Sequence, residues 1–231
     1  MDWIEFLILI KGWSTLSIVL RLLFSVVTGT VIGLDRAIKR RGAGIKTHVL
    51  VSLGSALVMM TGQFIQLNYE GTMDVARLGA QLISGVGFLG VGTIIVTGQH
   101  QVKGLTTAAG LWACACIGLA VGIGFIDGAL LALFFVIFSF KVLSKIDNIV
   151  QNRSRYYDLY IEFPTNKCVS LFINELHNQE VKIISFELGD SKINGEGTNA
   201  ILSIQLKNRK QNKTIFSDLR QMDCVKYMEL L

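Results

Sequence analysis

Ionisable side chains stand inside long apolar runs of this chain, where such groups are rare. Arg21 and Asp35 occur in the first run, and His48 opens the second. An ionisable group at membrane depth is costly unless it is paired or hydrated, so each one marks a candidate functional position. Arg21 either extends to the nearest water or faces other helices, where it would need a carboxylate or several carbonyl oxygens. Asp35 either makes local contacts, with the adjacent Arg36 or with water, or helps to bind a hard cation or a polar partner surface. For a cation, one carboxylate is a poor site without further oxygens.

Further polar side chains recur at helical spacing, so they share helix faces. Two stripes and one pair are present: Arg77, Gln81 and Ser84; His48, Ser52 and Ser55; and Thr106 with Thr107. They could line a wet cavity, or they could form hydrogen bonds between helices, which is the more common use of Ser, Thr and Gln in membranes. The spacing alone leaves both alternatives open.

No arrangement typical of an enzyme is visible in the sequence. A Walker loop, an HExxH motif, a Ser/His/Asp set and a carboxylate dyad are all missing. Residues 85–90 do spell G-x-G-x-x-G, but a dinucleotide site needs those glycines between a buried strand and a helix. The four cysteines also lack the spacing of metal ligands. We therefore predict no catalytic residue, no metal site and no cofactor.

Glycines of the apolar runs are interpreted as helix-packing positions, because small residues let helix backbones approach closely in lipid. The predicted packing positions are Gly29, Gly33, Gly85, Gly87, Gly90, Gly92, Gly118 and Gly122.

The composition divides the chain into two different parts. Of 231 residues, 51% are hydrophobic and 17% charged, and the mean hydropathy is +0.51. Residues 1–140 carry 15 charged residues, whereas the 91 residues that follow carry 24. These values exclude a single soluble domain, a disordered chain and a disulfide scaffold.

The apolar runs predict five transmembrane helices, at about 14–34, 47–66, 78–97, 105–122 and 126–143, within a membrane domain of residues 1–145. About 20 helical residues cross the roughly 30 Å of hydrocarbon in a bilayer. The run 105–140 is too long for one crossing, and glycines with Asp127 predict a hairpin turn within residues 122–128.

Every second connecting loop is basic, and residues 35–46 hold five basic residues. Loops rich in Lys and Arg face the cytoplasm, which predicts an external N-terminus and a cytoplasmic C-terminal domain. Because the basic clusters flank apolar runs, the net charge of +5 favours a lipid surface over nucleic acid as the partner.

The polar tail, residues 155–231, shows strand and helix patterns in the order βαββαβ. This order is typical of a small ferredoxin-like α+β domain with an antiparallel sheet. The fold hosts many functions and assigns none.

Three long motifs carry a family resemblance: TGTVIGLDRAIKRRGAGIKTHVLVSLGSAL at 28–57, AQLISGVGFLGVGTIIV at 80–96 and VKGLTTAAGLWACACIGLAVGIG at 102–124. They closely resemble the MgtC/SapB family of bacterial inner-membrane proteins. The tail is similar, in element order only, to the ACT-like domain of some members. The resemblance implies a multi-pass protein linked to growth at low Mg²⁺ and, in pathogens, to survival inside host cells.

The resemblance also implies which residues matter. Asp35 stands where the family usually has Glu, and Arg36 follows it as in the family pattern. Residues 45–47, with Lys46 and Thr47, stand where Leu-Arg-Thr is common, and Arg77 with Gln81 also map onto the pattern. Lys46 cannot form the bidentate pair that Arg would form.

Two functions are compatible with these observations. The first is a non-enzymatic regulator that acts on other membrane proteins, among which the resemblance suggests the rotary ATP synthase; self-association is also open. The second is a channel or transporter for Mg²⁺ or another ion, which would use the polar groups of the bundle.

Overall fold

The computed structural model describes residues 9–69, 74–96, 102–190, 197–207 and 212–231. The chain divides into two compact units, Met1–Ile146 and Asp147–Leu231.

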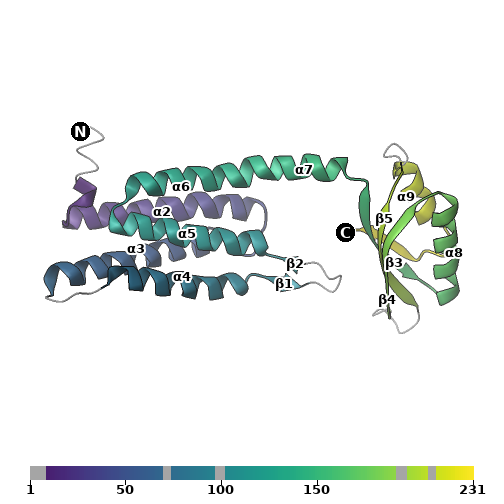
Figure 1. Cartoon of the computed structure of the whole chain (residues 1–231), viewed down its shortest axis with the longest axis horizontal. Coiled ribbons are helices and arrows are strands. Elements are labelled where there is room, and N and C mark those ends of the chain that lie inside the picture. The colour runs from purple at the N-terminus through teal and green to yellow at the C-terminus, as the bar shows by residue number, and fades with distance from the viewer. Residues whose placement is uncertain (1–8, 70–73, 97–101, 191–196, 208–211) are drawn as a thin grey trace. The chain divides into compact units, whose positions relative to one another are not determined.

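The first unit is a bundle of apolar helices. They are α2 (Thr15–Ile38), α3 (Ile45–Asn68), α4 (Val75–Val91), α5 (Leu105–Ile123) and α6 (Ile126–Phe138). The helices lie side by side, and α5 contacts α2, α3, α4 and α6 (Figure 1). In the described part of the chain, α2, α3, α5 and the helical run Ile126–Val150 are long and apolar enough to cross a membrane.

The third predicted span, 78–97, differs from the structure at both ends. Helix α4 begins at Val75, because the side chain of Asp74 accepts the Ala76 N–H and caps the first turn. It ends at Val91 after 17 residues, where the Thr93 hydroxyl donates to the Gly90 carbonyl. The apolar run continues as strand β1 (Ile95–Val96), paired with β2 (Val102–Lys103); residue 97 lies outside the described residues. Hydropathy placed these β-branched residues in the helix, although they favour an extended backbone.

The last predicted span, 126–143, is not one uniform helix. A π-helical turn, η1 (Ser139–Leu143), follows α6 and leads directly into α7 (Ser144–Arg153). The hairpin predicted within 122–128 is confirmed: α5 ends at Ile123, its C-cap Gly124 has φ +86°, and α6 starts at Ile126. Glycine fits that left-handed conformation at a helix end.

Four glycines bring α3 against its neighbours. An added Cβ at Gly29 or Gly33 of α2 would lie 2.6 Å from the Cα atom of Val49 or Ile45, respectively. An added Cβ at Gly118 or Gly122 of α5 would lie at most 2.5 Å from the carbonyl oxygen of Ser52 or Ala56 of α3, respectively. Such contacts replace the hydrophobic effect as the packing force where lipid surrounds the helices.

The second unit consists of β3 (Tyr156–Phe163), α8 (Asn166–Asn178), β4 (Lys182–Asp190), β5 (Thr198–Gln205), α9 (Asn212–Arg220) and β6 (Tyr227–Leu230). Its four strands form an antiparallel sheet in the order β4-β5-β3-β6. Helices α8 and α9 cover one face (Figure 1) and enclose a core that includes Phe163, Phe172 and Leu219. The element order is the one that the sequence pattern predicts.

Candidate functional site

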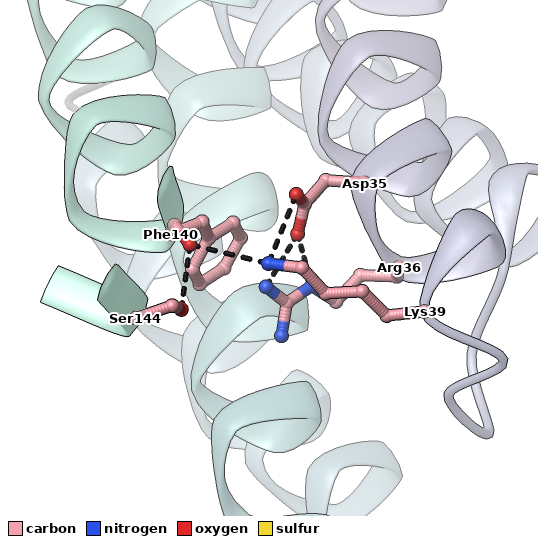
Figure 2. Close-up of polar contacts among 5 residues, drawn as sticks. All are labelled: Asp35, Arg36, Lys39, Phe140 and Ser144. Carbon is pink, nitrogen blue, oxygen red and sulfur yellow. Dashed lines mark hydrogen bonds and ion pairs between the residues drawn. The ribbon is translucent and has the colours of Figure 1, made fainter. Parts of the chain in front are cut away.

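The carboxylate of Asp35 is held by two cations of its own helix end. Its Oδ2 atom accepts from Nε and Nη2 of Arg36 at 3.1 and 2.5 Å, and its Oδ1 atom lies 3.1 Å from Nζ of Lys39 (Figure 2). The Arg36 side chain is buried, and that of Asp35 is 18% exposed. Of the two alternatives for Asp35, the geometry is that of local ion pairing. The cluster keeps one net positive charge.

Lys39 extends this cluster to the π-helical turn. Its Nζ atom donates to the carbonyl oxygen of Phe140 at 3.2 Å, and the hydroxyl of Ser144 donates to the same oxygen at 2.7 Å (Figure 2). An α-helix would give that carbonyl to the Ser144 N–H, which here pairs with the Val142 carbonyl. The side chains of Lys39 and Ser144 therefore serve a carbonyl at the widened turn. Interruptions of this kind are frequent at functional sites.

The ring of Phe140 is the second contact between α2 and the turn. The Arg36 guanidinium carbon lies 3.7 Å from the ring centroid, which is a close cation–π contact. On α5, Gly110 leaves room for the ring, since an added Cβ there would lie 3.2 Å from Phe140 Cζ and 3.7 Å from His48 Nε2.

His48 is fully buried between these helices. Its Nδ1 lies 2.9 Å from the Gly44 carbonyl. Because a carbonyl only accepts, Nδ1 carries the proton and the neutral ring presents Nε2 as an acceptor. That Nε2 atom is buried and has no hydrogen-bond partner among the residues that the structure describes. The contact cluster formed by Asp35, Arg36, Lys39, Phe140 and Ser144, together with His48, is the candidate site and is called the Asp35 site below.

The polar stripe of α3 continues inward from His48. Ser52 and Ser55 are fully buried, and the Ser52 hydroxyl bonds to that of Thr28 on α2 at 3.0 Å. The Cys114 thiol on α5 donates to the His48 carbonyl at 3.3 Å. Ser55 donates to the Val51 carbonyl of its own helix. The stripe thus contributes hydrogen bonds within and between helices.

Arg21 is a separate, fully buried centre. Its guanidinium donates to the carbonyls of Ile10 and Gly122 at 2.8 Å and to Gln63 Oε1 at 2.7 Å. The carbonyls of Lys11 and Gly12 accept at 3.2 Å. The charge is therefore directed into the bundle and satisfied by oxygens. The positive group suits the Gly122 carbonyl, because free carbonyls at a helix C-terminus carry partial negative charge.

The other sequence-predicted residues differ in burial and packing. Lys46, Thr47, Arg77, Gln81 and Thr106 are exposed, and Thr107 is buried. An added Cβ at Gly90 would contact Ala108 of α5 at 3.3 Å, whereas one at Gly85 or Gly87 would meet no atom within 4 Å. At Gly92 it would meet only carbonyl oxygens of its own helix end.

The Asp35 site is not arranged as a metal centre. Both carboxylate oxygens are already engaged by cations, and Mg²⁺ needs several oxygen ligands in octahedral geometry. Among the residues that the structure describes, no three His, Cys, Asp or Glu side chains gather as metal ligands.

Sequence reasoning missed four contributors to these centres: Lys39, Phe140, Ser144 and Gln63. Lys39 lies one helical turn after Asp35, so i,i+4 spacing could have found it. Phe140 contacts Lys39, 101 positions away, through its backbone carbonyl. Gln63 contacts Arg21, 42 positions away, through its side-chain amide. No local pattern marks them.

The chain is similar to several bacterial proteins. It is 31% identical to "Putative magnesium transporter YhiD" of Escherichia coli over 173 residues, which are 73% of this chain and 78% of that protein. It is 29% identical to SapB of Bacillus subtilis over 217 residues, which are 90% and 92% of the two chains. MgtC of Brucella abortus is 38% identical over 109 residues, which are 47% of this chain and 44% of that protein. No solved structure matches the chain significantly.

The model of the MgtC family matches residues 22–149. This match begins within α2, includes α3 to α6 and the π-helical turn, and contains every residue of the Asp35 site. The chain therefore belongs to the MgtC family.

Proposed function

We propose that this bacterial membrane protein is a non-enzymatic regulator that acts on other membrane proteins in Mg²⁺ homeostasis. The link to magnesium rests on the name of the Escherichia coli relative, which describes a magnesium transporter, and on the family resemblance. The regulatory part rests on the exposed face of one helix.

The observation that carries the proposal is a face of α4 that no described residue of the chain covers. Arg77, Gln81 and Ser84 are exposed on it, and Phe88 is 81% exposed. Beside Phe88, an added Cβ at Gly87 would meet no atom of the described residues within 4 Å. Polar groups that face lipid are costly, and open glycines let a partner helix approach closely. A transmembrane helix of another protein would satisfy both conditions.

In this proposal the chain crosses the membrane five times, with the N-terminus outside and an ACT-like second unit in the cytoplasm. The 17 residues of α4 rise by about 26 Å, which is within the range of transmembrane helices. The basic residues between α2 and α3, which include Arg40 and Arg41, support a cytoplasmic position of that loop.

An ion transporter is the second candidate. The name of the Escherichia coli relative and a carboxylate, Asp35, at the end of an apolar helix favour it. The ion pairs of Asp35 favour the regulator over the transporter, because a passing cation would have to displace both Arg36 and Lys39 from the carboxylate.

Mg²⁺ entry into liposomes distinguishes the two candidates. Purified protein would be reconstituted with an internal Mg²⁺ indicator and compared with Asp35→Asn and with empty vesicles. We expect the empty-vesicle rate for both proteins. Entry above that rate that falls in Asp35→Asn would establish the transporter instead.

Photo-crosslinking in cells tests the regulator directly. A photoreactive residue would replace Phe88 on α4 or, as a control, Leu131 on α6, which is 61% exposed. We expect a defined adduct with another membrane protein at position 88 in low-Mg²⁺ medium, which Gly87→Leu removes. Equal adducts at both positions would refute a specific α4 interface.

A further inference from the structure

The π-helical turn at Phe140 is held by contacts that compensate for two unfavourable features. The turn interrupts the α-helical hydrogen-bond pattern between α6 and α7. Close to it, Nε2 of His48 is buried, and no described residue donates a hydrogen bond to it. An unsatisfied buried polar atom costs about 1–3 kcal/mol. The arrangement therefore needs specific contacts to be the favoured one.

Those contacts come from the C-terminal end of α2, including its C-cap Lys39, and from Ser144, the first residue of α7. Lys39 and Ser144 donate to the Phe140 carbonyl. Arg36 lies against the Phe140 ring at 3.7 Å, while Asp35 holds both cations in place. The end of α2 thus acts as a clasp on one residue of the turn (Figure 2).

A second arrangement is available to the same residues. If the Ser144 N–H bonds to the Phe140 carbonyl, the turn becomes α-helical and that carbonyl no longer needs Lys39. The surplus residue of the wide turn then moves along the helix, which rotates the following residues by about 100° and shifts them by about 1.5 Å. Phe140 would leave its place beside Gly110, and His48 Nε2 would become accessible to a hydrogen-bond donor such as water.

We propose that the turn Ser139–Leu143 is a two-state register switch, which the Asp35–Arg36–Lys39 clasp holds in the π-helical state. The switch changes the rotation of α7, the helix that runs from the bundle into the second unit of the chain. A signal that moves the end of α2 is thereby passed along the chain as a rotation. This inference is independent of which proteins the chain regulates.

Cysteine labelling along α7 tests the switch in the full-length protein in lipid nanodiscs. Single cysteines would be placed at positions 145 to 150. The maleimide labelling rate of each would be measured on the peptide that contains it, so labelling of the native cysteines, which lie on other peptides, is recorded separately. In Lys39→Met we expect the profile of labelling rates along positions 145 to 150 to be displaced by one residue relative to the parent protein. An unchanged profile would overturn the proposal.

Deletion of Val142 supplies the decisive comparison. Removing one residue from a π-helical turn leaves a regular α-helix with the same rotation on both sides, so no surplus residue remains to move. Lys39→Met should therefore change the profile in the parent but leave it unchanged in the deletion protein. The same change in both would show a general loosening and refute the switch. Should the deletion protein not fold, Ser144→Ala tests the same carbonyl and should move the profile in the direction of Lys39→Met; a profile that stays fixed in Ser144→Ala would refute the switch as well.

Discussion

The Nζ atom of Lys39 lies 3.2 Å from the carbonyl oxygen of Phe140, so the end of α2 is bonded to a residue 101 positions later in the chain. Lys39 is 34% exposed, and partly exposed ion pairs contribute little because water and salt screen them. We expect Lys39→Met to lower the free energy of unfolding by only about 1 kcal/mol or less. Thermal unfolding in detergent measures this.

Arg40→Met is the control for that measurement, because it removes the neighbouring exposed cation. It should change stability no more than Lys39→Met does. A loss of several kcal/mol in Lys39→Met would mean that the lysine holds the whole bundle together, and a selective effect on helix rotation would then be untenable.

Arg21 should be far more important for stability. Its substitution by Met would leave the carbonyls of Ile10 and Gly122 without their donor inside the bundle. Each buried acceptor left without a donor costs about 1–3 kcal/mol, and Arg21 serves several of them. Unfolding followed by tryptophan fluorescence is suitable, since Trp13 lies 5.9 Å from the guanidinium.

Arg77→Met is the matched control, because it removes an exposed arginine from the same unit. We expect stability close to that of the parent. Arg21→Lys should be intermediate, since one ammonium cannot reproduce the planar set of donors. Equal effects of Arg21→Met and Arg77→Met would contradict the network described above.

Gly29→Ala and Gly54→Ala test helix packing with the same substitution at a crowded and at an open position. A Cβ at Gly29 would lie 2.6 Å from Cα of Val49, so α2 and α3 would have to separate. Overpacking of this kind costs about 1–3 kcal/mol. At Gly54 of α3 nothing lies within 4 Å, and Gly54→Ala should be neutral or gain up to about 1 kcal/mol from helix propensity. Similar losses in both variants would exclude a specific contact at Gly29.

Hydropathy predicted where helices occur, because burial in lipid depends on composition over many residues. It could not predict the end of α4, since Ile95 and Val96 are as apolar as the helix before them. Nor could it predict the π-helical turn: its register depends on Lys39 and Arg36, which are distant in sequence.

The buried centres show the same limit. Arg21 was recognised by its type and depth, and the need for several carbonyls was one of two stated alternatives. Which carbonyls accept depends on the ends of other segments, at Ile10 and Gly122. Helix rotation sets such contacts, and span counting contains no information on rotation.

The last prediction concerns Tyr227 in the second unit. Its hydroxyl donates to the Glu229 carboxylate at 3.0 Å. This hydrogen bond, reinforced by the negative charge of Glu229, raises the pKa of Tyr227. Phenolate absorbance from Tyr227 should therefore develop at a higher pH than that of free tyrosine, whose pKa is about 10. The difference between titrations of the parent and Tyr227→Phe isolates this residue.

The sign for stability follows from the raised pKa. The folded state keeps the Tyr227 proton more tightly than the unfolded state does, so its contribution is complete below the unfolded pKa. It is lost as the pH rises through the folded pKa. Glu229→Gln should return the titration toward that of free tyrosine, because the amide carries no charge. Glu180→Gln, which removes a carboxylate paired with Lys207, should leave it unchanged. If both variants shift Tyr227 equally, the net charge of the unit sets its pKa rather than the contact with Glu229.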